Sequence, residues 1–177
     1  YPESIRYLAN KYNIEIIETV DTSENIEERN ERESLFIINN FASSYFQEKL
    51  SEKEEINKYL MDRGLSSTTI ENFNLGYSID SQNNFYKKAN ENGYSDEYLQ
   101  ETGLVINSDN KKIDRFRGRI IFPIKSISGR VLGFGGRIIE SNKKIAKYIN
   151  SPESKIYNKS KVLYGIYESK QFIVKDD

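Results

Sequence analysis

Residues 114–124 of the chain read Asp114-Arg115-Phe116-Arg117-Gly118-Arg119-Ile120-Ile121-Phe122-Pro123-Ile124. Successive side chains of a strand point to opposite faces of its sheet. One face would carry Phe116, Gly118, Ile120, Phe122 and Ile124, and the other would carry Arg115, Arg117, Arg119 and Ile121. Gly118 and Pro123 interrupt any helix over the same residues. The stretch therefore predicts a strand with three arginines on one face, and Pro123 indicates a sheet edge or a bend.

The residues after this strand predict its partner. Ser128-Gly129 is a tight-turn signal, and Arg130 to Ile139 would return as the second strand of a β-hairpin. Further along, residues 163–170 favour a short helix, and Phe172 favours the start of another strand.

Helical periodicity dominates the chain before residue 110. An apolar stripe runs from Ser34 to about Leu50, and a second helix from Glu52 to Met61 would end at Gly64. Ser66 or Ser67 would cap a third helix, and a short helix is expected over residues 3–12. The predicted fold class is α+β, with a helical N-terminal part packed on a small, twisted, mostly antiparallel sheet.

Composition excludes several kinds of chemistry. The chain has 177 residues, of which 37% are hydrophobic and 30% charged, and it contains no Cys and no His. Disulfides, Cys/His zinc sites, thiol nucleophiles and imidazole-dependent triads are therefore excluded. No apolar run approaches the roughly 20 residues of a membrane span. Because the chain begins at Tyr1 rather than Met, we expect it to be a piece of a longer protein.

The net charge of −1 hides a strong asymmetry. Residues 1–110 hold 10 Lys+Arg and 21 Asp+Glu, whereas residues 111–161 hold 14 Lys+Arg and 3 Asp+Glu. A basic block on an acidic body is typical of a surface that faces phosphates. The alternative is that the two blocks pair with each other in the fold.

Three groups of residues are candidates for phosphate or nucleotide binding. The arginines at 115, 117 and 119 would lie about 6.5 to 7 Å apart along the strand, close to the phosphate repeat of an extended single strand. Arg137 follows the glycines of Gly133-Phe134-Gly135-Gly136, which otherwise indicate a bulged or kinked strand. Lys147, Tyr148 and Asn150 precede Ser151-Pro152, and the same residues also fit a simple proline turn.

Catalytic acids are scarce in the basic block. Only Asp114, Glu140 and Glu153 are available there, and they are scattered. Because metal-assisted phosphoryl transfer uses closely grouped carboxylates, these residues alone predict binding without catalysis.

Five stretches, in order, resemble the bacterial DnaG-type DNA primases. They are Tyr59-Leu60-Met61-Asp62-Arg63-Gly64-Leu65, residues 114–124, Gly129-Arg130-Val131-Leu132-Gly133-Phe134-Gly135-Gly136-Arg137, Lys147-Tyr148-Ile149-Asn150-Ser151-Pro152-Glu153 and Leu163-Tyr164-Gly165. The chain departs from the family pattern at Ala146, Ile149 and Gly118.

The resemblance implies the N-terminal lobe of the primase RNA polymerase core. Residues 1–20 would end the linker from a preceding domain, 21–110 would form the helical part, and 111–177 the basic β-rich part leading into a TOPRIM lobe. The family's zinc-binding domain and TOPRIM lobe are both expected to be absent from this chain. Zinc would belong only to the former and magnesium only to the latter.

The resemblance also implies an activity. The whole protein would be a cytoplasmic nucleotidyltransferase that makes short RNA primers from ribonucleoside triphosphates on single-stranded DNA during replication, with no membrane partner. It would contact the replicative helicase through an absent C-terminal domain, and the isolated chain would be inactive. Two alternatives stay open: a non-catalytic nucleic-acid-binding module and a regulatory nucleotide-binding domain.

Carried over to this sequence, the family pattern assigns two sets of residues. Arg115 and Arg117 would contact template or nucleotide phosphates in a basic groove, together with Arg119, and Arg63 is a further candidate near the same groove. The second set would line the nucleotide site and comprises Arg137, Lys147, Tyr148 and Asn150.

Overall fold

The computed structural model describes residues 23–139 and 145–173, and side chains are described from residue 26, except those of Gln171 and Phe172. The chain divides into two units, residues 1–31 and 32–177. The described part of the first unit is the beginning of helix α2, Ser23–Ser51. The helix predicted over residues 3–12 lies outside the described residues. The packing and the sites described below belong to the second unit.

The predicted helical part is confirmed. Helix α2 is followed by α3 Glu54–Asp62, α4 Ser67–Asn72, α5 Asn84–Glu91 and α6 Asp96–Glu101. The Ser66 hydroxyl accepts the Thr69 N–H (3.1 Å) and caps α4, as the sequence predicts. Helix α2 begins at Ser23, well before the predicted Ser34, because Glu and Arg residues are good helix formers even without an apolar stripe.

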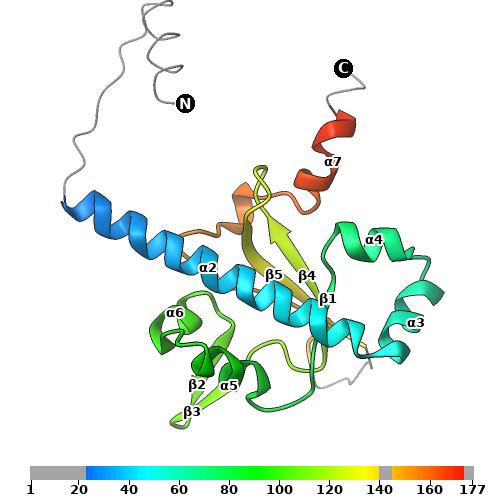
Figure 1. The fold of residues 1–177 in the computed structure, drawn as a ribbon, viewed down its shortest axis with the longest axis horizontal. Coiled ribbons are helices and arrows are strands. Elements are labelled where there is room, and N and C mark those ends of the chain that lie inside the picture. The colour runs from blue at the N-terminus through cyan, green and yellow to red at the C-terminus, as the bar shows by residue number, and fades with distance from the viewer. Residues whose placement is uncertain (1–22, 140–144, 174–177) are drawn as a thin grey trace, which may run out of the picture. The chain divides into compact units, whose positions relative to one another are not determined.

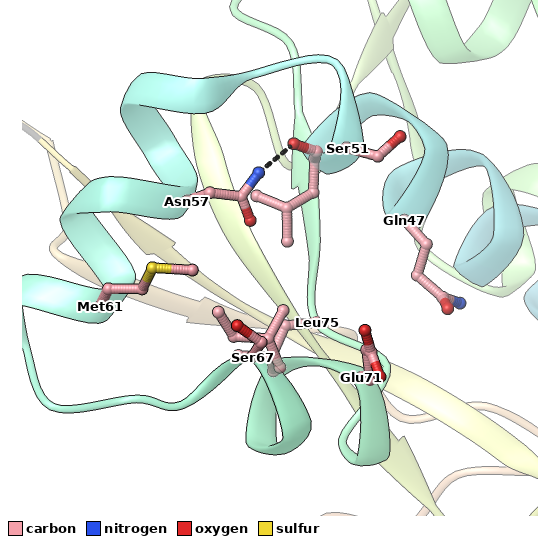
Figure 2. A pocket seen from close by; sticks show the side chains of 9 residues that line it. Gln47, Ser51, Asn57, Met61, Ser67, Glu71 and Leu75 are labelled. Atoms are coloured by element: carbon pink, nitrogen blue, oxygen red, sulfur yellow. Dashed lines mark hydrogen bonds between the residues drawn. The ribbon is translucent and has the colours of Figure 1, made fainter.

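Helices α2, α3 and α4 enclose a pocket of about 350 Å³ (Figure 2). Its inner wall includes Leu50, Ile70 and Leu75, and Gln47 and Glu71 lie among its polar lining residues. Asn57 donates to the Leu50 carbonyl (2.8 Å), which ties the first turn of α3 to the last turn of α2. This pocket contains none of the predicted binding residues.

The main sheet has four antiparallel strands in the order β1-β4-β5-β6. Their bounds are β1 Gly76–Ser78, β4 Arg119–Lys125, β5 Val131–Ile138 and β6 Tyr148–Asn150. Figure 1 labels β1, β4 and β5 of this sheet. The predicted hairpin around Ser128-Gly129 is confirmed as β4–β5. A second sheet pairs β2 Val105–Ser108 with β3 Lys111–Asp114. Pro123 lies inside the sheet rather than at an edge, but its missing N–H falls beyond the end of β1, which pairs only with residues 119–121.

The single strand predicted over residues 114–124 is wrong in its first half. Strand β3 ends at Asp114, residues 115–118 form a turn, and β4 begins at Arg119. The Asp114 carboxylate accepts the N–H groups of Phe85 (2.8 Å) and Tyr86 (2.9 Å) at the start of α5, which draws the chain away from the sheet. Gly118 then turns it with φ +64°. The three arginines therefore do not share a strand face.

The strand predicted at Phe172 is also wrong. Helix α7 spans Ile166–Ile173, after a short 3-10 helix η1 at Lys159–Lys161. Glu168 of α7 forms a buried ion pair with Lys125 of β4 (2.8 Å), and Lys170 donates to the Ile127 carbonyl (3.2 Å). These contacts fix α7 against the β4–β5 hairpin in the helical state.

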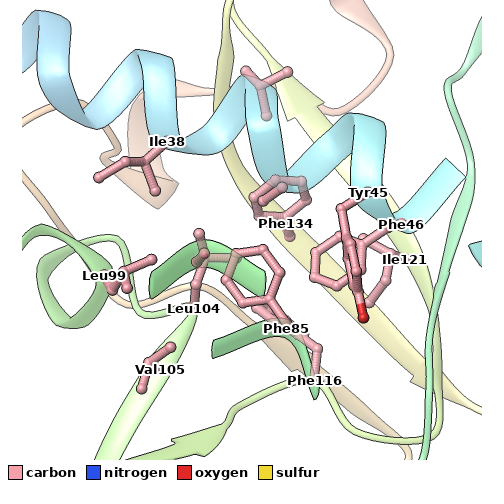
Figure 3. Close-up of a cluster of buried hydrophobic side chains, with 13 residues drawn as sticks. Ile38, Tyr45, Phe46, Phe85, Leu99, Leu104, Val105, Phe116, Ile121 and Phe134 are labelled. Atoms are coloured by element: carbon pink, nitrogen blue, oxygen red, sulfur yellow. The ribbon is translucent and has the colours of Figure 1, made fainter. Parts of the chain in front are cut away.

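The core lies between helix α2 and one face of the main sheet (Figure 3). It is rich in aromatic rings, and Phe46, Phe85, Phe116 and Phe134 are all almost completely buried. Alternation then holds along β4: Ile121 joins this cluster, whereas Ile120 and Phe122 pack on the opposite face with Leu60 of α3. The opposite face is covered by α3 and α4 next to β1, and beyond β4 it carries the residues described below.

We predict a pH dependence of stability that originates in Asp114. Burial raises the pKa of Asp114 from 3.8 to about 6, although the N–H groups of Tyr86 and Phe85 and the charge of Arg117 act in the opposite direction. The folded state therefore binds this proton more tightly than the unfolded chain does. The stability that this provides is present below pH about 4 and is lost as the pH rises through about 6.

Between pH 4 and 7 the free energy of unfolding of the parent should fall by about 2.5 kcal/mol relative to that of Asp114→Asn, as measured by urea unfolding of both proteins. A difference between the two that does not change with pH would contradict this prediction.

Candidate nucleic-acid and nucleotide interface

The turn between β3 and β4 places arginines along one groove. This arginine groove has a volume of about 680 Å³ and is lined by Glu55, Ile56, Tyr59, Tyr77, Asp80, Arg115, Arg117, Gly118, Arg119, Ile138, Ile139 and Ile145. Arg117 is exposed, and Arg115 is half-buried with its Nη2 donating to the Asn150 carbonyl (3.3 Å). The buried Nε of Arg115 has no hydrogen-bond partner among the described residues. Arg115 and Arg117 thus reach the same groove from a turn instead of a strand.

Arg119 differs from its two neighbours because it is only 4% exposed. Its guanidinium donates to the carbonyls of Ala146 (2.8 Å), Lys147 (3.2 Å) and Gly136 (3.5 Å). Burial lowers the pKa of Arg119, but a guanidinium keeps its charge at any physiological pH. The guanidinium of Arg119 therefore donates its hydrogen bonds to backbone carbonyls and holds the segment that leads into β6 in place.

The predicted nucleotide-binding residues meet on the sheet face opposite α2. Arg137 of β5 pairs in register with Tyr148 of β6, and Gly135 pairs with Asn150. Because alternate residues share a face, Gly135, Arg137, Tyr148 and Asn150 lie together. Lys147 precedes Tyr148 by one residue, and its Nζ is 5.8 Å from the centroid of the Tyr148 ring. The sheet thus brings three of the four residues onto one face and leaves Lys147 exposed beside them.

A second groove of about 420 Å³ runs over this face. This sheet groove is lined by Phe122, Ile124, Gly135, Gly136, Tyr148, Asn150, Tyr157, Lys159, Val162 and Tyr164. A Cβ on Gly135 would come within 3.2 Å of the Asn150 Oδ1, so a side chain there would crowd the groove. Tyr157, Lys159 and Tyr164 were not predicted as site residues, although Leu163-Tyr164-Gly165 is one of the stretches that resemble the primases.

Arg137 lies between the two grooves and is bound by two tyrosines. Its Nε donates to the Tyr148 hydroxyl (3.1 Å), and its Nη1 donates to the Tyr59 hydroxyl of α3. The exposed Arg63, four residues after Tyr59, lies over the Tyr59 ring with its Cζ 5.2 Å from the centroid. Tyr59 was not predicted as a site residue, and its spacing from Arg63 on one helix face is the signal that could have found it.

Ion pairs connect the acidic block with the basic block. Arg130 binds Glu33 in bidentate fashion (2.8 and 2.6 Å), and Lys112 pairs with Asp96 (3.1 Å). Within the described ranges none of the five predicted arginines pairs with a carboxylate. In this α+β domain the five predicted arginines lie in or beside two grooves, and none of them forms an ion pair with a carboxylate of the described residues. This arrangement is typical of a nucleic-acid-binding domain.

The described residues do not supply a metal site. In residues 23–139 and 145–173 no group of three or more acidic side chains could hold a metal ion. The magnesium that the resemblance implies therefore has no such group of ligands there. None of the helices among the same residues has the length and hydropathy of a membrane span.

Comparison with known proteins identifies the family. Residues 45–170 match the model of the DNA primase catalytic core, N-terminal domain. The DNA primase of Clostridium acetobutylicum is 36% identical over 166 residues, which are 94% of this chain and 27% of that protein. The chain belongs to the DnaG-type DNA primase family. It spans less than a third of the length of the curated relatives it matches, since the Salmonella typhimurium DNA primase is covered to 30%.

Solved structures share the fold. The DnaG primase catalytic domain bound to ssDNA has a TM-score of 0.76 and 33% identity, and the match covers 82% of this chain and 46% of that one. The Aquifex aeolicus primase, solved with its zinc-binding and RNA polymerase domains, has a TM-score of 0.76 and 30% identity, with 98% of this chain and 41% of that one covered. The α+β fold class is confirmed.

Proposed function

We propose that this chain is the part of a DNA primase that binds single-stranded DNA template and the phosphates of ribonucleoside triphosphates. The observation that carries the proposal is the meeting of Arg137, Tyr148 and Asn150 on one sheet face, with Arg115 bonded to the Asn150 backbone. Arginine forks bind phosphate oxygens, and aromatic rings stack on bases. The relative solved with ssDNA supports a template groove in this fold.

The whole protein would be a cytoplasmic nucleotidyltransferase that synthesises RNA primers for DNA replication. Its magnesium ligands, its zinc site and its helicase contacts would belong to segments outside this chain. Arg115 and Arg117 would bind template or nucleotide phosphates in the arginine groove. Arg137, Tyr148 and Asn150 would bind the nucleotide on the sheet face, with Lys147 beside them. Arg119 would act indirectly, by fixing the backbone of residues 146–147.

Replacing Arg115 and Arg117 together by alanine should weaken single-stranded DNA binding by about 10-fold or more, because two charge-assisted contacts are lost. The slope of log K against log salt should become shallower by about 1.4. Fluorescence anisotropy of a labelled oligonucleotide over a salt series measures both quantities.

The matched control is Lys87→Ala with Lys88→Ala, which removes the same charge from α5, outside both grooves. If the control pair weakens binding as much as the arginine pair does, the effect is one of net charge and the groove is not the template site.

The chain alone should not make primers. Because no carboxylate cluster for a catalytic metal is found among the described residues, template, ribonucleoside triphosphates and magnesium should give no RNA product with the purified chain. A gel assay with labelled nucleotides measures this, and any template-dependent product would contradict the assignment of the metal ligands to another part of the protein.

A further inference from the structure

The guanidinium of Arg137 is held at two of its nitrogens by tyrosines from different elements. Tyr148 of β6 accepts from Nε (3.1 Å), and Tyr59 of α3 accepts from Nη1. The described residues give Nη2 no hydrogen-bond partner. The hydrogen bonds from Nε and Nη1 fix the plane of the Arg137 guanidinium, and they leave Nη2 available to donate to a ligand oxygen.

The two tyrosines differ in how firmly they are placed. Tyr148 is 62% exposed and belongs to a three-residue strand at the edge of the main sheet. Tyr59 is half-buried on α3, and its ring packs against the cluster that contains Ile56, Leu60 and Ile120. Tyr59 is therefore the fixed support of Arg137, whereas Tyr148 is free to contact a ligand.

The Tyr59 ring contacts a second cation, Arg63, in addition to Arg137. The Cζ atoms of Arg63 and Arg137 lie 5.2 and 5.5 Å from its centroid. Each contact is favourable because the ring face is negative, but the two guanidinium charges repel each other. An anion placed beside both charges would remove this repulsion, and a polyphosphate provides several oxygens for it.

We infer that Tyr59 is a positioning residue that orients the Arg137 guanidinium toward the triphosphate of a nucleotide. This inference rests on the proposed function, because it concerns the same nucleotide site. Tyr59 acts through Arg137 and not by touching the reacting atoms. Loss of its hydroxyl should therefore matter only while Arg137 is present.

The test measures ATP affinity without divalent metal, using the 177-residue chain and a fluorescent ATP. Tyr59→Phe keeps the ring and removes the hydroxyl, and it should weaken binding about 5-fold. Tyr94→Phe, which removes a hydroxyl from a ring that packs at a tilt against Phe41, should leave the affinity unchanged. In the Arg137→Met background the further change Tyr59→Phe should alter the affinity less than about twofold.

A second measurement reports on Arg137 without any ligand. Rotation about the Cζ–Nε bond exchanges Nη1 with Nη2, and the bond from Nη1 to Tyr59 opposes it. Nitrogen-15 NMR of the Arg137 guanidinium should show faster rotation in Tyr59→Phe and no change in Tyr94→Phe. Unchanged rotation in Tyr59→Phe overturns the inference whether or not ATP binds.

The binding outcomes separate the two proposals. If Arg137→Met leaves ATP affinity unaltered, the proposed nucleotide site is wrong. If Arg137→Met weakens binding but Tyr59→Phe does not, or if Tyr59→Phe weakens it equally in both backgrounds, the site stands and the positioning role of Tyr59 is wrong.

Discussion

Phe134→Ala should lower the free energy of unfolding by about 3 to 5 kcal/mol, the range for emptying a fully buried aromatic site. Phe134 is completely buried, and its ring centroid lies 5.7 Å from that of Phe46 on α2 and 6.2 Å from that of Phe116 in the turn at residues 115–118. The cavity would therefore remove contacts among helix α2, the main sheet and the turn at residues 115–118. Urea unfolding followed by circular dichroism measures the change.

The matched control for this substitution is Phe73→Ala, which removes the same atoms from a half-buried ring at the end of α4. Phe73→Ala should lower the free energy of unfolding clearly less than Phe134→Ala does, because fewer contacts are lost and water can enter the space. Equal losses for the two variants would mean that the core around Phe134 collapses to fill its cavity.

Gly103→Ala should lower the free energy of unfolding by about 3 kcal/mol, although it adds only one methyl group. Gly103 follows α6 with φ +68°, a conformation that costs an L residue about 1 to 2 kcal/mol. Its added Cβ would also overlap the ring of Pro152, and such overpacking costs about 1 to 3 kcal/mol. Pro152 follows Ser151, whose hydroxyl accepts the Phe134 N–H (3.0 Å), so the displacement would reach Asn150 and weaken ATP binding as well.

Gly93→Ala separates the two causes. Gly93 has φ +81°, and a Cβ there would meet nothing within 4 Å. This variant should lose only the backbone contribution and keep its ATP affinity. If Gly103→Ala and Gly93→Ala are equally destabilising, the contact between Gly103 and Pro152 does not constrain the binding face.

Local signals in the sequence predicted the parts of the fold that depend on neighbours along the chain. The Ser128-Gly129 turn, the Ser66 cap and the Gly64 helix end all act over a few residues, and each is present. The same is true of the alternation along β4 from Ile120 onward. The matched motifs also led to Arg137, Tyr148 and Asn150, which the sheet brings onto one face.

The features that the sequence did not predict depend on contacts between residues that lie far apart along the chain. The strand breaks at Asp114 because its carboxylate binds N–H groups of α5 almost thirty residues earlier. Arg119 is buried because carbonyls at residues 136, 146 and 147 surround its guanidinium. Tyr59 reaches Arg137 across 78 positions of sequence. Spacing along a helix can show that Tyr59 lies beside Arg63, but it does not show which residue far along the chain Tyr59 contacts.

The pairing of β5 with its neighbours has a genetic consequence. Gly135 and Arg137 lie on the sheet face opposite α2, whereas Phe134 and Gly136 lie on the face toward the core, so the two faces alternate from residue to residue. Loss of one codon within β5 would shift all later residues to the wrong face. A deletion before residue 137 would place the arginine at the position of Gly136, where even a Cβ would overlap the ring of Phe116. In a mutational scan, single-codon deletions in residues 133–137 should therefore be tolerated less than most substitutions there, whereas deletions in the Ser126–Gly129 turn should be tolerated more readily.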